Sequence, residues 1–281
     1  MRGVGRASAA ISIVNALPTG IGCAHGVRLY VAIAAEIDPG TPFQVAVDPE
    51  ESRTPVVIRS AEVAVSRLGS RTDYNVHLHL DSKIPVAKGL KSSSAVSTAT
   101  IQAVADAFHS PLPPIEVARM AASVGREVGV SASGAFDDAL AGLLPGFVVT
   151  DNSRGELLLR RPADPEWTAV VHIPPGTHPR SPGVQGRFQP PTPEAVSAAQ
   201  AAREGAWTVA MEQNTVVVER AMGYDYQDLR DRLRREGAVA SGVSGLGPAL
   251  VALVPRGRAE SALRALPSER FVVPLASEAH S

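Results

Sequence analysis

The sequence predicts a mixed fold, with strands and helices interspersed through one large domain or two closely packed subdomains. Length is the first observation, because 281 residues are enough for either arrangement. Composition is the second: 44% of the residues are hydrophobic and only 4% aromatic, which predicts a core of alanine, valine and leucine. Periodicity is the third, since alternating stretches typical of strands lie between stretches with helical spacing.

Charge and cysteine content exclude several classes of protein. The 27 basic and 28 acidic residues nearly cancel, and without a basic stripe or an acidic tail the main partner is not expected to be nucleic acid or a membrane. No apolar run reaches transmembrane length or resembles a signal core. Cys23 is the single cysteine, so neither an intramolecular disulfide nor a thiolate metal cluster can form. We expect a cytoplasmic protein that acts on a small molecule, and the oligomeric state does not follow from the sequence.

The N-terminal part of the chain is expected to be mainly β. Residues 8–17 read as a strand, 19–26 as a loop with three glycines, 27–37 as a strand, and 43–47 as another after a turn. The glycine-rich segment is either a loose hairpin connection or a place where a ligand approaches the backbone.

A helix is expected over 54–69, with Thr54 as its cap and Pro55 as its first residue. In the strand expected over 75–80, His77 and His79 lack a third metal ligand, so we interpret them as ordinary strand residues.

The stretch 85–95 joins that strand to an alanine-rich helix expected over 92–108. A helix start offers unpaired N–H groups and the positive end of the macrodipole, which suits an anion. Glycine allows close approach, two lysines add charge, and three serines could cap the helix or bind a metal. One serine would suffice for a cap, and the pattern is not a Walker A loop, so we expect a phosphate site. Its candidate residues are Pro85, Val86, Ala87, Lys88, Gly89, Leu90, Lys91, Ser92, Ser93, Ser94 and Ala95.

A second chemically dense stretch follows the helix expected over 115–128. Glu127 lies near the end of that helix, where a carboxylate opposes the macrodipole, which hints at a cation partner. Asp137 and Asp138 are adjacent and framed by small residues. Such a pair can serve a metal, act as a base or cap a helix, and the residues alone leave these alternatives open. Strands are expected at 146–150 and 156–160.

The remainder begins with a strand at 168–173 and a proline- and glycine-rich segment at 174–193. This segment is interpreted as a long loop or lid. It contains His178, Arg180 and Arg187, and the two arginines could reach a substrate carboxylate or simply be solvated.

The last part of the chain combines helices with a third glycine-rich loop. Arginines fill the helix expected at 226–236, which favours a solvated face. They are Arg230, Arg232, Arg234 and Arg235. The other expected elements are helices at 193–204, 206–222 and 258–266, a loop at 240–248, and strands at 249–254 and 271–273.

The three loops, taken in this order, resemble the GHMP kinase superfamily. Its central motif P-x-x-x-G-L-x-S-S-A is matched at Pro85, Gly89, Leu90, Ser92 and Ser93. The archaeal-type shikimate kinases of that superfamily are more similar still, with I-P-x-x-x-G-L-K-S-S-S-A, G-A-x-D-D-A, T-D-N and S-G-x-G-P. This chain carries these patterns at 84–95, 134–139, 150–152 and 244–248, so the resemblance spans essentially the whole chain. One departure is that 22–26 lacks the acidic G-E-H signature of many superfamily members.

The resemblance implies an α+β, two-lobed GHMP kinase fold. The N-terminal lobe would be ribosomal protein S5 domain 2-like and bind ATP (residues 1–152), and a ferredoxin-like C-terminal lobe (153–281) would complete the acceptor site. The implied activity is ATP-dependent, Mg²⁺-assisted phosphorylation of the 3-hydroxyl of shikimate in chorismate biosynthesis. The alternatives are homoserine kinase or another small-alcohol kinase on the same fold, and, in a different class, a non-catalytic nucleotide-binding protein.

The same resemblance implies roles for individual residues. The stretch 85–95 would wrap the ATP phosphates, and Ser93 with Glu127 would hold Mg²⁺. Asp137 stands at the position of the superfamily's catalytic aspartate, with Asp138 as the alternative, and some members work without such a base. Further candidates for the acceptor site and third loop are Asn15, Thr19, Asp151, Asn152, Ser244, Gly245 and Gly247.

Overall fold

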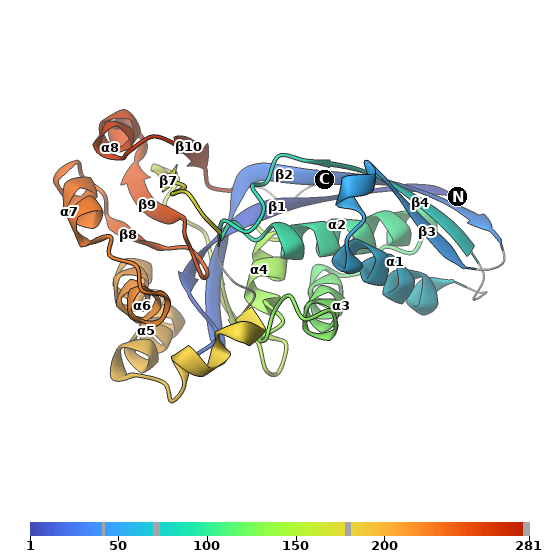
Figure 1. Cartoon of the computed structure of the whole chain (residues 1–281), viewed down its shortest axis with the longest axis horizontal. Helices are drawn as coiled ribbons and strands as arrows, with labels where there is room; N and C mark the ends of the chain where they lie inside the picture. Colours follow the sequence, from blue (N-terminus) through green and yellow to red (C-terminus); the bar gives the residue numbers. More distant parts are fainter. Residues whose placement is uncertain (41–42, 70–73, 178–180, 278–281) are drawn as a thin grey trace.

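The chain folds into two lobes that lie side by side, each with its own sheet (Figure 1). The computed structural model describes residues 1–40, 43–69, 74–177 and 181–277. The first sheet has the strand order β3-β4-β2-β5-β6 with β1 added on β2, and the second has the order β10-β7-β9-β8. The two-lobed α+β architecture is therefore confirmed. Within the described parts of the chain, no helix is both long and apolar enough to cross a bilayer.

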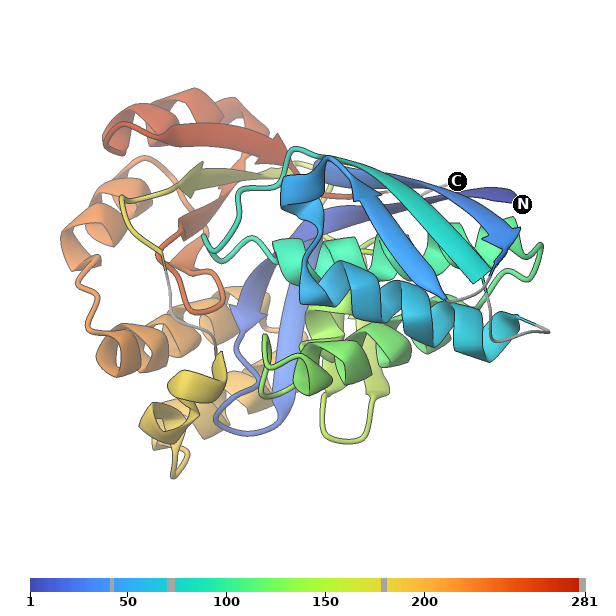
Figure 2. The ribbon, with the colours of Figure 1, turned by 45° about the vertical axis from the view of Figure 1, so that its right-hand side comes forward.

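The N-terminal lobe packs its helices on one face of its sheet (Figures 1 and 2). Its strands are β1 (Arg2–Val14), β2 (Ile21–Pro39), β3 (Gln44–Asp48), β4 (Tyr74–Ser82), β5 (Phe147–Asp151) and β6 (Glu156–Arg161). Its helices are α1 (Pro55–Leu68), α2 (Ser92–Ala107), α3 (Pro114–Glu127) and α4 (Phe136–Ala141), with a short 3₁₀ turn at Glu50–Ser52.

The C-terminal lobe carries its helices around an antiparallel sheet. Its strands are β7 (Trp167–His172), β8 (Ala240–Val243), β9 (Leu250–Pro255) and β10 (Arg270–Pro274). Its helices are α5 (Pro193–Glu204), α6 (Trp207–Met222), α7 (Gln227–Arg235) and α8 (Ala259–Ala265), with 3₁₀ turns at Ser181–Gly183, Gln185–Phe188 and Arg256–Arg258.

The C-terminal half of helix α2 lies unusually close to β1. A Cβ atom built on Gly3 would lie 2.1 Å from the backbone nitrogen of Ala107, and one on Gly5 would lie 2.0 Å from the carbonyl oxygen of Ala99. Glycine on the strand and alanine on the helix are thus what permits this contact. The helix that follows the stretch 85–95 is consequently the buried centre of the lobe.

The loop predicted at 19–26 is wrong, because residues 21–26 begin the long strand β2. They pair with β5 on one side and with the end of β1 on the other. The glycines of this segment serve helix packing. A Cβ on Gly22 would lie 2.5 Å from Cγ of Asp137, and one on Gly26 would lie 2.5 Å from the carbonyl oxygen of Ala141.

Two further predictions in the C-terminal half need correction. Ser241 and Gly242 were expected in a loop, but they lie in β8, so the third loop comprises residues 244–248 only. Arg230 was expected on a solvated face, but it is only 5% exposed, because two carboxylates from α6 pair with its guanidinium.

The predicted lid at 174–193 contains local structure that the sequence did not indicate. Its two 3₁₀ turns bury Val184 and Phe188 in a cluster with Leu17 and Val217. Arg187 is exposed, and the candidates His178 and Arg180 lie outside the described residues. The other predicted helices and strands are confirmed to within a few residues, except that β1 begins well before residue 8.

Candidate active site

A cavity of about 810 Å³ opens where the third loop meets the N-terminal lobe. Its wall comes from the end of β1, the start of α1, the loop and first turn of α2, the α3–α4 connection, and two residues of the third loop, Gly245 and Leu246. Cavities of this size that collect a few polar groups are typical of small-molecule and cofactor sites. Most of the sequence-predicted site residues can be placed relative to it.

The stretch 85–95 forms a strained loop at the N-terminus of α2. Ala87, Gly89 and Lys91 all have positive φ angles, of 55°, 89° and 65°, a conformation that costs a non-glycine residue free energy and often marks functional sites. Lys91 occupies the N-cap position and makes no side-chain cap hydrogen bond. The serine-cap alternative is therefore wrong. The serines occupy the first turn, where Ser92, Ser93 and Ser94 line the cavity.

The third loop and β1 hold this strained loop in place. The Oγ of Ser244 donates a 2.7 Å hydrogen bond to the carbonyl oxygen of Gly89 and accepts one of 3.1 Å from the backbone nitrogen of Ser12. A Cβ on Gly89 would lie 2.2 Å from the carbonyl oxygen of Ser244. Glycine is thus required at position 89 both by its φ angle and by the close approach of the other lobe.

Lys91 and Asp138 form a buried ion pair on the cavity wall. The Nζ of Lys91 lies 3.0 Å from Oδ2 of Asp138, and their side chains are only 14% and 7% exposed. Burial and the neighbouring Asp137 charge raise the pKa of Asp138 to about 7, against the lowering effect of Lys91. The Oδ1 of Asp138 is buried and has no hydrogen-bond partner among the described residues, and Asp138 is one of the residues that line the cavity.

Asp137 lies beside this pair, and polar side chains of the β5 end fix it there. Its Oδ1 accepts a 2.8 Å hydrogen bond from Nδ2 of Asn152, whose Oδ1 in turn accepts from Thr150 Oγ1 at 2.7 Å. Burial raises the pKa of Asp137, while the Lys91 charge and the Asn152 hydrogen bond lower it. Asn152, which the sequence suggested as part of the site for the phosphoryl acceptor, thus binds Asp137 instead.

The local chain conformation explains how both carboxylates reach the cavity. Gly134 and Ala135 have positive φ angles, and the backbone nitrogen of Ala135 donates to Ser133 Oγ at 3.2 Å. This kink starts α4 abruptly, so Asp137 and Asp138 fall in its first turn.

Among the other acceptor candidates, Asn15 and Gly245 line the cavity. The Nδ2 of Asn15 donates to the carbonyl oxygen of Gly245 at 3.2 Å. Thr19 and Asp151 do not line the cavity: the Oγ1 of Thr19 accepts from the backbone of Ile21, and Asp151 shapes the turn that follows it. Gly247 packs on the ring of Tyr224.

Lys88 and the suggested metal ligand Glu127 point to other partners. The Nζ of Lys88 donates to the carbonyl oxygen of Gly176 at 2.5 Å. Glu127 is half exposed and lies 2.9 Å from Nε of Arg59. It does not line the cavity, although its neighbours Gly125 and Val128 do, whereas Ser93 lines it. The structure thus brings together Lys91, Asp137 and Asp138, but not Lys88 or Glu127.

The sequence did not reveal the far arm of the cavity, beside the start of α1. Ser52, Thr54, Pro55, Asp81 and Ser82 line this arm. The only signal was the helix cap at Thr54, which accepts a hydrogen bond from the backbone of Val57. A cap is a structural signal, so it could not mark a binding surface.

Two family models match the chain, one for each lobe. The GHMP kinases N terminal domain matches residues 56–146, and the GHMP kinases C terminal model matches residues 195–273.

Curated archaeal proteins are similar over nearly their whole length. A shikimate kinase of Pyrococcus abyssi is 33% identical over 90% of this chain and 92% of its own. A shikimate kinase of Pyrococcus furiosus is 34% identical with the same coverage.

Solved structures share the fold at low sequence identity. A homoserine kinase from Cytophaga hutchinsonii superimposes with a TM-score of 0.76 at 16% identity, covering 99% of this chain and 96% of its own. The mevalonate kinase of Methanococcus jannaschii superimposes with a TM-score of 0.72 at 14% identity, covering 99% of both chains. With both lobes matched by family models and archaeal relatives above 30% identity over nine-tenths of their length, this chain belongs to the GHMP kinase family.

Proposed function

We propose that this protein is an ATP-dependent shikimate kinase, which transfers the γ-phosphoryl group of ATP to the 3-hydroxyl of shikimate in chorismate biosynthesis. The observation that carries the proposal is one cavity that joins an uncapped helix start to a buried lysine–aspartate pair, in a chain about one-third identical to archaeal shikimate kinases. ATP as donor makes the cytoplasm the natural compartment.

The loop 85–95 is proposed to bind the ATP phosphates. Phosphoryl transfer depends mainly on positioning and on neutralising charge. Free N–H groups at the start of α2, the macrodipole and the buried Lys91 ammonium supply positive charge on one side of the cavity. The arm beside α1, lined by Ser52, Thr54 and Asp81, would receive the nucleoside.

Asp138 is proposed as the base, with Asp137 in a supporting role. The unpartnered Oδ1 of Asp138 would accept the proton as the acceptor oxygen attacks the γ-phosphorus and ADP departs. Asp137 is less suited, because Asn152 already donates to its Oδ1. Its negative charge instead raises the proton affinity of Asp138.

Mg²⁺ is proposed to bind with the nucleotide, held by Ser93 and Glu127. Their oxygen donors suit this ion, which usually binds one or two carboxylates together with substrate phosphates. Ser93 lines the cavity, and Glu127 is half exposed in an ion pair with Arg59 that it would have to leave. A bound ion would neutralise charge on the phosphates.

The acceptor is identified by measuring ADP release from purified protein with ATP and shikimate, homoserine or mevalonate. We expect turnover with shikimate and a product phosphorylated at the 3-hydroxyl, located by nuclear magnetic resonance. Turnover with homoserine but none with shikimate would overturn the proposed acceptor while leaving the kinase site intact.

A further inference from the structure

Two tyrosines of the C-terminal lobe bind the carbonyl groups of the third loop. The hydroxyl of Tyr224 donates to the carbonyl oxygen of Leu246 at 2.9 Å, and that of Tyr226 donates to the carbonyl oxygen of Pro248 at 3.0 Å. Their rings are stacked, with centroids 5.5 Å apart. A Cβ on Gly247 would lie 2.5 Å from the Tyr224 ring, so loop and ring are in tight contact.

The same loop contacts both Lys91 and Gly89. A Cβ on Gly245 would lie 2.8 Å from Nζ of Lys91, so the loop backbone forms the wall against which the ammonium group lies. Ser244 also donates to the carbonyl oxygen of Gly89. Any shift of the loop would therefore move the surroundings of the Lys91–Asp138 pair.

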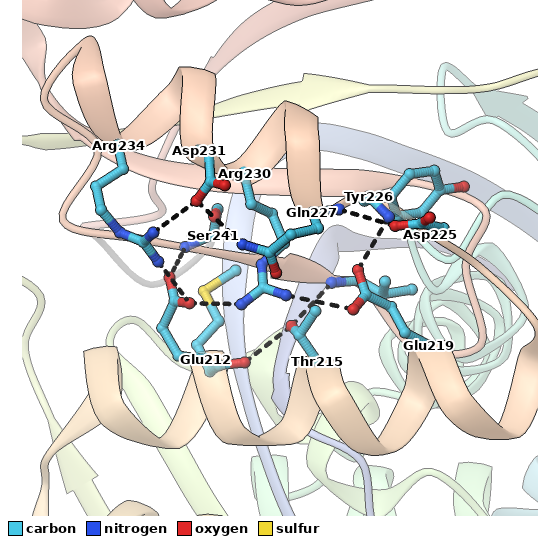
Figure 3. Close-up of polar contacts among 12 residues, drawn as sticks. Glu212, Thr215, Glu219, Asp225, Tyr226, Gln227, Arg230, Asp231, Arg234 and Ser241 are labelled. Carbon is cyan, nitrogen blue, oxygen red and sulfur yellow. Dashed lines mark hydrogen bonds and ion pairs between the residues drawn. The ribbon is translucent and has the colours of Figure 1, made fainter.

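A buried arginine fixes the segment that carries the tyrosines (Figure 3). Arg230 extends from α7 toward α6, where its guanidinium lies 2.7 Å from Glu212 and 3.3 Å from Glu219. Glu219 accepts from the backbone nitrogen of Tyr226 through its side chain and from that of Tyr224 through its carbonyl oxygen. The connection between α6 and α7 is thus anchored on both sides of the stacked rings.

Helix α6 also anchors the strand that leads into the loop. Glu212 accepts from the backbone nitrogen of Ser241 at 3.0 Å, and Thr215 Oγ1 accepts from that of Val243 at 3.2 Å. Both carboxylates that bind Arg230 therefore hold backbone groups leading to the third loop, one through β8 and one through the tyrosines.

We propose that Tyr224 and Tyr226 are positioning residues for phosphoryl transfer, which hold the third loop against Lys91 and are themselves held by the Arg230 cluster (Arg230, Glu212 and Glu219). They lie outside the residues that line the cavity, so they act through the loop and not on the substrate. The inference rests on the proposed function only in placing the reaction at Lys91.

The test is the double substitution Tyr224→Phe and Tyr226→Phe, which keeps the stacked rings and removes only the two hydroxyls. We expect kcat to fall about tenfold, since small misplacements in an active site are costly, while KM for ATP and for the acceptor changes little. Thermal unfolding measured in parallel reports any loss of stability. A lower unfolding temperature with kcat and both KM values unchanged would reduce the tyrosines to a structural role and overturn the proposal.

A second arm asks whether the effect passes through Lys91. In a Lys91→Ala background, with residual transfer followed by radiolabelled ATP, the double tyrosine substitution is expected to cause no further loss. If the loss caused by the double tyrosine substitution is as large in the Lys91→Ala background as in the wild-type protein, the link to Lys91 is overturned.

The control is Arg234→Gln, which removes an exposed contact to Glu212 and is expected to leave kcat unchanged. The assay uses whichever acceptor the wild-type protein phosphorylates. If the wild-type protein phosphorylates another acceptor but not shikimate, that result counts against the proposed acceptor and not against this inference.

Discussion

Among single residues, Lys91 is the one whose meaning the structure changes most. Its place in the motif suggested one more charge near a helix start, whereas the structure makes it the left-handed N-cap residue of α2 and the buried partner of Asp138. One side chain thereby links the proposed phosphate loop to the proposed base.

Replacing Lys91 with methionine is expected to reduce kcat by about 100-fold or more, because a buried cation near the transferred group stabilises the transition state. Steady-state kinetics measures the loss. Lys88→Met is the matched comparison, since the Lys88 ammonium group contacts the carbonyl oxygens of Pro174 and Gly176. Its kcat should fall much less, and equal losses would contradict the distinction between the two lysines.

The raised pKa of Asp138 predicts a pH-dependent rate. A base must be ionised, and its pKa is raised to about 7, so its active form predominates above that pH. We expect kcat/KM to fall roughly tenfold per pH unit below it.

A pH profile of the wild-type enzyme and of Asp138→Asn checks this expectation. The variant should be slow at every pH and should lack the acidic limb. An acidic limb that persists in the variant would assign the titration to another group.

At the scale of helices and strands, the sequence predicted the elements that depend on local signals and missed those that depend on contacts with distant parts of the chain. Local signals were sufficient for three helices: a cap with helical periodicity for α1, alanine-rich composition for α2 and an apolar stripe for α3. The prediction of a loop at 21–26 failed because the glycines there make room for α4, a helix distant in the sequence. The prediction that Arg230 lies on a solvated face failed for a similar reason, because its carboxylate partners lie on another helix. The candidate site was predictable where residues were consecutive, and the arm beside α1 was not, because only folding brings it to the loop.

The contact between β1 and α2 predicts a large effect of one added methyl group. Gly5→Ala would place a Cβ 2.0 Å from the carbonyl oxygen of Ala99, and overpacking of this kind typically costs about 1–3 kcal/mol. Denaturant unfolding measures the change. Gly257→Ala, where no atom lies within 4 Å of the added Cβ, should be nearly neutral. Equal stability of the two variants would contradict this account of the contact.

The Arg230 cluster predicts a strong asymmetry between arginines of α7. Arg230→Met would leave the Glu212 and Glu219 carboxylates without their shared cation, and breaking a buried pair costs about 3–5 kcal/mol. Arg232→Met, at an exposed position of the same helix, is expected to stay within about 0.5 kcal/mol. Urea unfolding of both variants checks the difference, and similar stabilities would mean that the cluster contributes little.

For the whole molecule, the two lobes together form the proposed site. The N-terminal lobe supplies Lys91, Asp137 and Asp138, while the third loop of the C-terminal lobe supplies Gly245 and Leu246 and holds Gly89 through Ser244. Most of the cavity wall comes from the N-terminal lobe, and the third loop completes it. Ligand binding is therefore expected to stabilise the two lobes as one unit, by about 2.7 kcal/mol at a nucleotide concentration of a hundred times Kd.

The most direct test of phosphoryl transfer at the Lys91–Asp138 pair is shikimate-dependent ADP release by the wild-type protein and by Asp138→Asn, with ATP binding measured by calorimetry on both. We predict turnover by the wild type, loss of about 100-fold or more in the variant, and similar ATP affinity in the two. Undiminished turnover by Asp138→Asn would contradict the role of Asp138, and a wild-type protein that binds ATP but never phosphorylates shikimate would contradict the proposed function.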